Sequence, residues 1–290
     1  MTFPAPRFLS FVALALALAS AGCVETAAVH EHEPAAHEHE LAPNASTPSV
    51  TSAIAEIPWS YDGTTGPAHW SDLASTFSPC KVGTRQSPIP LFHNEHASEP
   101  RLTALQFDAP PSPVHLVNDG HTVIASPSVA SGLTTSHGHY KLVQFHFHVP
   151  SEHTLDGKHF DAEMHLVHQN AQGERAVVAF FFSVRERDND ALASFFDHPP
   201  TDANQEASPS APVDLARIVS AEHVAHAQSY LTYAGSLTTP ACGEGITWFV
   251  FTSPRFFGRT QWENLYAALH GHTNRPLQPR AGRTVSRFAP

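Results

Sequence analysis

The residues with the clearest potential for chemistry are two histidines in a short alternating run. In Gln-Phe-His-Phe-His-Val, residues 144–149, an extended strand directs Gln144, His146 and His148 to one face and the phenylalanines to the other. Two imidazoles at this spacing can reach the same metal ion. The chain contains 22 histidines, so such a pair also arises easily by chance.

A third histidine lies on a matching face of a second run, Ala-Glu-Met-His-Leu-Val-His-Gln-Asn. By the same alternation His165 shares its face with Glu163, whereas His168 faces the other way and is interpreted as structural. The dipeptide Asp156-Gly157 between the two runs is a strong hairpin signal. We therefore expect the two strands to be neighbours and their histidines to converge.

These three histidines have the composition of a catalytic zinc site. Three neutral imidazoles leave the fourth tetrahedral position of zinc open to water, whereas structural zinc sites fill all four. Gln144 and Glu163 each lie two residues from a histidine on the same face, where each can accept the ring N–H that does not face the metal. Their alternative interpretation is as polar groups on a solvated face.

The segments that must position these histidines predict a domain built mainly on a β-sheet. After Trp59 the chain consists of short apolar or alternating runs, such as 114–125 and 175–184, broken by Gly, Pro, Asn and Asp. Helical signals are fewer and shorter. We expect a single mainly β (α+β) domain over residues 58–290, with a large central sheet and short peripheral helices. Its length of about 230 residues is enough for one substantial core.

The N-terminus predicts export from the cytoplasm. Residues 1–22 carry one Arg, an apolar run from Phe8 to Ala19 and then small residues, and the run is too short to span a membrane comfortably. Residues 19–21, Ala-Ser-Ala, fit an ordinary cleavage site. Residues 21–23, Ala-Gly-Cys, resemble the lipoprotein box of bacteria, which makes Cys23 the first mature residue and a lipidation site.

Of these two routes the lipoprotein is the preferred interpretation. The chain has three cysteines, and lipidation of Cys23 leaves one pair for a disulfide. The expected location is the bacterial periplasm or cell envelope, anchored by lipid or otherwise soluble.

Residues 23–57 are read as a disordered linker, because they contain almost no large apolar residues. The sequence His-Glu-His-Glu occurs there twice, at 30–33 and 37–40; a solvated acidic linker is the favoured interpretation, and weak metal binding is the alternative. The whole chain has 16 basic and 27 acidic residues with no basic cluster, so nucleic acid is not expected as a partner. A homodimer is left open.

Several long motifs, in order, resemble the α-carbonic anhydrases of exported bacterial type over most of residues 59–290. They are WSYDGTTGPAHW from residue 59, RQSPIPL from 85, VNDGHTV from 117, QFHFH from 144, SEHTLDGKHFDAEMHLVH from 151, YAGSLTTPACGEGITWFV from 233 and NRPLQP from 274. The resemblance implies a twisted, mostly antiparallel sheet of about ten strands with one zinc ion at the base of a conical cleft. It also implies His146, His148 and His165 as the zinc ligands.

The activity implied by this resemblance is reversible hydration of carbon dioxide to bicarbonate and a proton by zinc-bound hydroxide. In this family pattern Glu152 and Thr238 form a hydrogen-bonded pair that orients the reactive oxygen, and His121 is the proton shuttle. Residues matching the carbon dioxide pocket are Val167, Val177, Leu237, Thr239 and Trp248. Cys80 and Cys242 match the disulfide of exported members.

Two positions depart from the family pattern near the predicted shuttle. Asp119 replaces the usual Asn and adds a negative charge, and Ile124 stands where an amide is common in the cleft. Both changes bear on water order and proton transfer. The alternatives to carbon dioxide hydration are cleavage of activated esters, zinc storage without catalysis, and a structural role in the cell envelope. Inactive relatives typically lose a zinc histidine, and all three histidines are present here.

Overall fold

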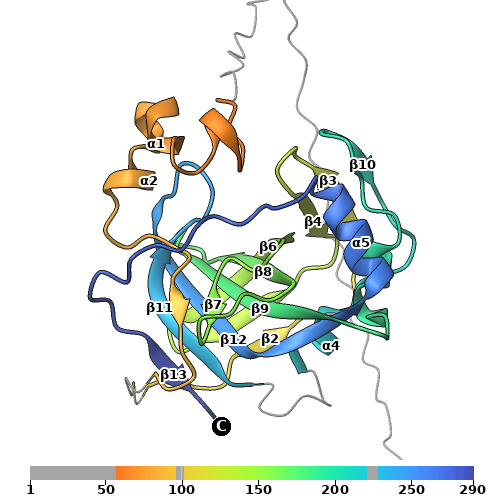
Figure 1. The fold of residues 1–290 in the computed structure, drawn as a ribbon. Helices are drawn as coiled ribbons and strands as arrows, with labels where there is room; N and C mark the ends of the chain where they lie inside the picture. Colours follow the sequence, from red (N-terminus) through yellow and green to blue (C-terminus); the bar gives the residue numbers. More distant parts are fainter. Residues whose placement is uncertain (1–56, 96–98, 100, 221–227) are drawn as a thin grey trace, which may run out of the picture. The chain divides into compact units, whose positions relative to one another are not determined.

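The computed structural model describes residues 57–95, 99, 101–220 and 228–290, which all belong to one compact unit, Ile54–Pro290 (Figure 1). The predicted signal peptide, the lipidation site Cys23 and almost all of the linker lie outside the described residues. Within the described ranges, no helix is long and apolar enough to cross a membrane. The proposed boundaries at residues 22 and 57 therefore stay predictions.

The fold is dominated by one sheet of 11 strands, as the alternating runs predicted. Along the sheet the strands are β10 (Glu206–Ala207), β3 (Val114–Asn118), β4 (Val123–Pro127), β6 (Gly138–His148), β8 (Ala162–Gln169), β9 (Arg175–Arg185), β12 (Glu244–Gly258), β11 (Tyr230–Ser236) and β13 (Ser286–Phe288). β2 (Gln106–Asp108) pairs with β5 (Gly132–Thr135), which pairs with β6. Strand pairs in this sheet are antiparallel except the central β9–β12 pair, which is parallel.

The helices are short and lie at the margin of the sheet (Figure 1). They are α1 (Trp70–Leu73), α2 (Pro79–Val82), α3 (Ala193–Phe196), α4 (Leu215–Ser220) and α5 (Arg259–Ala268), with 3-10 turns at Gly63–Thr65, Ser75–Phe77 and Asp190–Leu192. A separate two-stranded sheet pairs β1 (Pro90–Leu91) with β7 (Thr154–Leu155). The mainly β class with a large, mostly antiparallel sheet and peripheral helices is confirmed, with 11 strands in place of about ten.

The alternation of side chains along β6 and β8 divides the interior into two apolar clusters. Phe145, Phe147, Met164 and Leu166 belong to the larger cluster, and the first three are fully buried. The alternate residues of the same strands, which include the predicted zinc ligands, point to the other face. Burial of the phenylalanines and leucine therefore fixes the face on which the histidines lie.

The connection between β6 and β8 contains the turn that the dipeptide Asp156-Gly157 predicted. Both residues have positive φ, 49° and 77°, and Leu155 and Lys158 exchange backbone hydrogen bonds across them. The turn closes on β7 and does not join β6 directly to β8. The two long strands are nevertheless neighbours, and their antiparallel register is continuous from Gln144 to His148.

Candidate metal centre

The strand register brings the three predicted histidines together. His146 on β6 pairs with His165 on β8, and His148 pairs with Glu163. The candidate ligand nitrogens of His146, His148 and His165 all lie within 4.8 Å of one another. His148 and His165 are each 1% exposed, whereas His146 is only partly buried.

Each of these imidazoles is held through the ring nitrogen that the metal would not use. His146 Nδ1–H donates to Gln144 Oε1 at 2.8 Å, and His165 Nε2–H donates to Glu163 Oε1 at 2.8 Å. His148 Nδ1–H donates to the backbone carbonyl of Thr273 at 2.6 Å. These bonds leave Nε2 of His146, Nε2 of His148 and Nδ1 of His165 for a metal, because each neutral imidazole carries only one N–H.

The chemistry of this donor set fits zinc. His148 Nε2 is buried without a hydrogen-bond partner among the described residues, which is the state of a nitrogen reserved for a metal. Burial lowers the pKa of His146 well below its ordinary value, and the nearby His148 and His165 lower it further. Burial also lowers the pKa of His148, although Glu152 opposes the shift. Neutral imidazoles of this kind are ligands for zinc.

Glu163 is held by a second histidine that the sequence pattern did not single out. Its Oε1 also accepts from His153 Nδ1–H at 2.6 Å, and its Oε2 accepts from the backbone N–H of His153 at 2.8 Å. His153 Nε2 then accepts from the Tyr233 hydroxyl at 2.6 Å. Burial alone would raise the pKa of Glu163, but His153 and His165 outweigh it and hold the pKa well below its usual range.

The group His153, Glu163 and His165 is also close enough to bind a metal. Its nitrogens and carboxylate oxygen are already used in mutual hydrogen bonds, so it serves the first site and is not a second one. Strand parity could not identify His153, because that residue lies in the connection after β6.

Glu152 lies beside His148 and is fully buried. Its Oε1 accepts from the backbone N–H of Arg275 at 2.9 Å, and its Oε2 lies 3.6 Å from His148 Nε2. Oε2 has no hydrogen-bond partner among the described residues, and the expected bond from the Thr238 hydroxyl is absent from the same part of the chain. Thr238 itself is buried, with 5% of its surface exposed. One carboxylate oxygen is therefore free to accept a hydrogen bond.

His121 follows β3 in a turn built by Asp119. The Asp119 carboxylate accepts from the backbone N–H of His121 at 2.8 Å and from that of Thr122 at 2.7 Å. The ring of His121 stacks on Trp59, with centroids 3.6 Å apart and planes 11° from parallel. Asp119 thus forms the local structure that presents His121. The sequence pattern did not identify Trp59 as its neighbour.

The predicted pocket residues Val167, Val177, Leu237 and Trp248 meet in the second apolar cluster. Val177 on β9 pairs with Val167 on β8 and with Trp248 on β12. The Trp248 ring lies 4.9 Å from the ring of His165, so this cluster borders the histidine group. Thr239 is partly buried in the loop after β11, where its carbonyl accepts from the Cys242 N–H at 2.8 Å.

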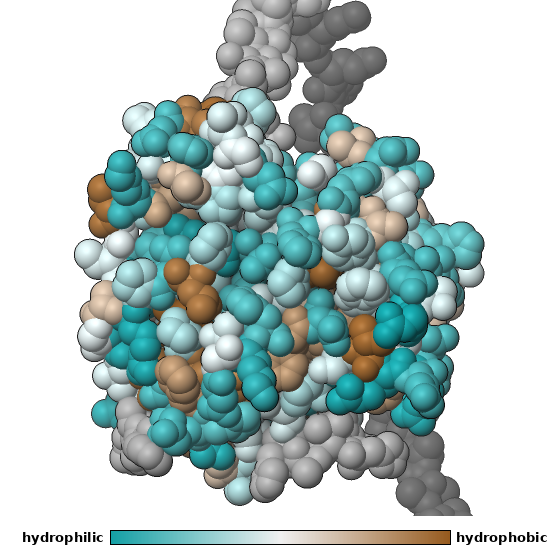
Figure 2. Space-filling model, in the orientation of Figure 1, coloured by the Kyte–Doolittle hydropathy of each residue, from teal (hydrophilic) through white to brown (hydrophobic). Residues whose placement is uncertain are grey.

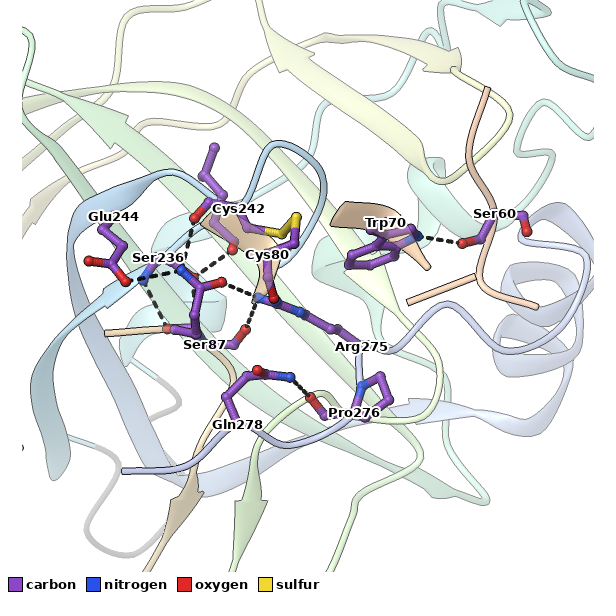
Figure 3. Close-up of a disulfide and its surroundings, with 12 residues drawn as sticks. Ser60, Trp70, Cys80, Ser87, Ser236, Cys242, Glu244, Arg275, Pro276 and Gln278 are labelled. Carbon is purple, nitrogen blue, oxygen red and sulfur yellow. Dashed lines mark hydrogen bonds between the residues drawn. A yellow bond between two sulfur atoms is a disulfide. The ribbon is translucent and has the colours of Figure 1, made fainter. Parts of the chain in front are cut away.

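Cys80 and Cys242 form the expected disulfide, which joins α2 to the loop between β11 and β12 (Figure 3). Leu237 N–H donates to the Gly243 carbonyl at 2.9 Å and closes the base of this loop. The disulfide therefore braces the loop that carries Thr238 and Thr239.

Comparison with known proteins identifies the family. The family model described as eukaryotic-type carbonic anhydrase matches residues 65–289. A carbonic anhydrase of Klebsiella pneumoniae is 37% identical over 229 residues, covering 78% of this chain and 89% of that protein. A carbonic anhydrase of Pectobacterium atrosepticum is 33% identical over 234 residues, covering 81% of this chain and 92% of that protein.

Solved structures lead to the same family. The α-carbonic anhydrase of Thermovibrio ammonificans, in complex with sulfanilamide, superposes with a TM-score of 0.73 at 33% identity, covering 79% of this chain and 99% of that one. The α-carbonic anhydrase of Photobacterium profundum superposes with a TM-score of 0.71 at 35% identity, covering 79% of this chain and 100% of that one. The chain therefore belongs to the eukaryotic-type carbonic anhydrase family, and the expected enzyme class, carbonic anhydrase, is confirmed.

Proposed function

We propose that this protein binds one zinc ion at His146, His148 and His165 and hydrates carbon dioxide reversibly to bicarbonate and a proton. The observation that carries the proposal is the orientation of the three imidazoles, each held by an acceptor on its other ring nitrogen. When bound, zinc acts as a Lewis acid that makes water nucleophilic near neutral pH, an effect for which carbonic anhydrases are themselves the standard example.

In the proposed mechanism Thr238 and Glu152 orient the attacking oxygen. Thr238 has a single hydroxyl proton, and the free Oε2 of Glu152 is a ready acceptor for it. Once the Thr238 hydroxyl donates that proton to Glu152, its oxygen can only accept a hydrogen bond. It therefore accepts from an O–H of the attacking nucleophile, and a lone pair of the nucleophile is left to face carbon dioxide. The N–H of Arg275 on Oε1 keeps the carboxylate in place.

The apolar wall supplies the site for carbon dioxide. Val167, Val177 and Trp248 belong to one cluster that borders His165, and such a surface accommodates an uncharged, apolar gas while excluding competing water. Leu237 packs against the same cluster, and Thr239 completes the proposed pocket from the adjoining loop. The position of this pocket at the base of a conical cleft stays a prediction.

His121 is proposed to carry the proton to solvent. The imidazole of an unperturbed histidine has a pKa near neutrality, so this type of side chain can accept and release a proton within the working pH range of a hydratase. The stacking on Trp59 and the turn made by Asp119 support this role, since they hold the ring in a defined place outside the histidine group.

The proposal extends to export and to a lipid anchor at Cys23. With Cys80 and Cys242 joined, Cys23 is the remaining cysteine of the chain, which agrees with lipidation at that residue. A structural disulfide also favours an oxidising compartment such as the periplasm. Homodimer formation and weak metal binding by the 23–57 linker stay predictions. Mass spectrometry of the mature N-terminus tests the anchor: a lipid adduct on Cys23 supports it, and an unmodified N-terminus rejects it.

The test of the proposed function is stopped-flow hydration of carbon dioxide by the full chain, with hydrolysis of an activated ester measured in parallel. Hydration by the wild type and its loss in His148→Ala support the proposal. His139→Ala is the matched control, because His139 lies on the same strand but is exposed. Ester cleavage without hydration rejects it in favour of an esterase.

A further inference from the structure

Arg275 is a buried cation with an unusual set of partners. Its side chain is 2% exposed, and within the described residues no carboxylate lies at ion-pair distance from it. Burial lowers the pKa of Arg275 only to about 10, so the guanidinium is charged at neutral pH. A buried charge held by neutral groups is costly, and this suggests that its position serves a purpose beyond packing.

The guanidinium joins α2 to the loop that follows it beside the disulfide (Figure 3). Nη1 donates to Gln86 Oε1 at 2.9 Å and to the Ser87 carbonyl at 2.8 Å, and Nη2 donates to the Cys80 carbonyl at 3.0 Å. Gln86 in turn donates through Nε2 to the Cys242 carbonyl at 3.1 Å. Arg275 is thus linked to both ends of the disulfide, directly at Cys80 and through Gln86 at Cys242.

The backbone around Arg275 makes two contacts with the catalytic residues. Its N–H donates to Glu152 Oε1, and two residues earlier the Thr273 carbonyl accepts from His148 Nδ1–H. The same short segment therefore holds one carboxylate and one metal ligand, while the Arg275 side chain anchors that segment to the disulfide region. The loop that carries Thr238 also contains Cys242, which is linked to the Arg275 side chain through Gln86 and through the disulfide to Cys80.

We propose that Arg275 is a positioning residue that sets the Glu152 carboxylate relative to the loop carrying Thr238. The inference rests on the proposed hydration function, in which those two residues orient the attacking oxygen. The planar guanidinium donates to three oxygens at once in fixed directions, which the single ammonium of lysine cannot reproduce. Loss of the guanidinium removes the hydrogen bonds that anchor the segment from Thr273 to Arg275. The backbone N–H of Arg275, which donates to Glu152, then loses its fixed position.

The test is a double-mutant cycle of Arg275→Met with Glu152→Gln in the zinc-loaded full chain. Arg275→Met alone is expected to retain zinc and to lower kcat about 10-fold to 100-fold, with a smaller change in KM. If Arg275 acts through Glu152, adding Arg275→Met to Glu152→Gln lowers kcat no further. Arg275→Lys is expected to restore little of the rate. If the fold-decreases in kcat of Arg275→Met and Glu152→Gln multiply in the double variant, the two residues act independently and the inference is overturned.

A matched control separates positioning from general stability. Arg255 is also buried and donates to the carbonyls of Ile218 and Val219, but it contacts none of the proposed catalytic residues in the described structure. Arg255→Met is expected to lower the unfolding midpoint while leaving kcat unchanged. An equal loss of kcat in Arg255→Met identifies the effect as loss of stability and rejects the inference.

A gentler variant covers the case in which Arg275→Met does not fold. Gln86→Met removes the link between Arg275 and Cys242 and keeps the guanidinium in place. Positioning is supported if Gln86→Met lowers kcat in the wild-type background but causes no further decrease in the Glu152→Gln background. A kcat that Gln86→Met leaves unchanged in the wild-type background contradicts it. A wild-type protein that hydrates no carbon dioxide rejects the proposed function, and with it this inference, whereas an active wild type with an additive cycle rejects the inference alone.

Discussion

His146 and His165 stand directly opposite each other on the antiparallel strands β6 and β8, with their ring centroids 5.3 Å apart. This pairing depends on register, because a shift of one residue would turn either histidine to the opposite face. Phe145 and Leu166 form the adjacent pair and are buried in the core, so the same packing that stabilises the sheet also places the candidate ligands.

Glu163→Gln is expected to weaken zinc binding about 10-fold to 100-fold, the usual effect of losing a group that orients a ligand. The neutral amide removes the charge that holds the N–H groups of His165 and His153. Competition with a chromogenic chelator measures the zinc dissociation constant. An unchanged constant would show that Glu163 does not orient the metal ligand.

His121→Ala is expected to slow hydration mainly in weak buffer, where the protein must export the proton itself. The expected loss is on the order of 10²-fold, at the lower end of general acid–base effects, and imidazole buffer should restore much of it. The measurement is the hydration rate as a function of buffer concentration. His137→Ala, an exposed histidine in the turn between β5 and β6, is the control. A rate for His121→Ala equal to wild type at every buffer concentration disproves the shuttle.

Stability is expected to fall in mild acid because of His168. Burial lowers the pKa of His168 to about 4, whereas the unfolded value is about 6.5. The unfolded state therefore binds more protons between these values, and the stability present above pH 6.5 is lost as the pH falls toward 4. The loss attributable to this group is about 2 kcal/mol between pH 7 and pH 5.

Urea unfolding at the two pH values tests the role of His168. His168→Gln removes the titrating group, so the difference in unfolding free energy between pH 7 and pH 5 should shrink by that amount in the variant. Identical pH dependence in the two proteins would mean that groups other than His168 carry the whole effect.

Reduction of the Cys80–Cys242 disulfide is expected to lower the free energy of unfolding by about 2–4 kcal/mol. The bond closes a loop between residues 162 positions apart, so it restricts the unfolded chain as well as bracing the Thr238 loop. Urea unfolding with and without reductant measures the change. The double variant Cys80→Ser and Cys242→Ser should match the reduced protein, and no difference between oxidised and reduced wild type would contradict the prediction.

Much of the site could be predicted because it follows from local alternation. The runs around His146 and His165 are long, regular strands, so the alternation of side chains alone predicted that these histidines share one face of the sheet. Phe145 and Phe147, which alternate with the histidines of β6, are buried on the opposite face and maintain that arrangement. The turn residues Asp156 and Gly157 were equally recognisable, since both need positive φ. The disulfide and the roles of Glu152 and Thr238 depended on family resemblance, because loop residues carry no such pattern.

The remaining contacts could not be predicted because they join distant segments through groups that lack a sequence signature. The acceptor for His148 is the backbone carbonyl of Thr273, and a carbonyl is present in every residue. Arg275 and Tyr233 contact Glu152 and His153 across 123 and 80 residues of sequence, so these contacts depend on tertiary packing. The stacking of Trp59 on His121 likewise arises from tertiary structure.

Zinc-dependent hydration is tested most directly by stopped-flow measurement with carbon dioxide before and after zinc is removed by a chelator and then restored, with His165→Ala measured in parallel. We expect one zinc ion per chain, fast hydration that disappears with the metal and returns with it, and neither zinc nor hydration in His165→Ala. Hydration that survives complete removal of zinc, or a His165→Ala variant with full zinc content and full rate, would contradict it.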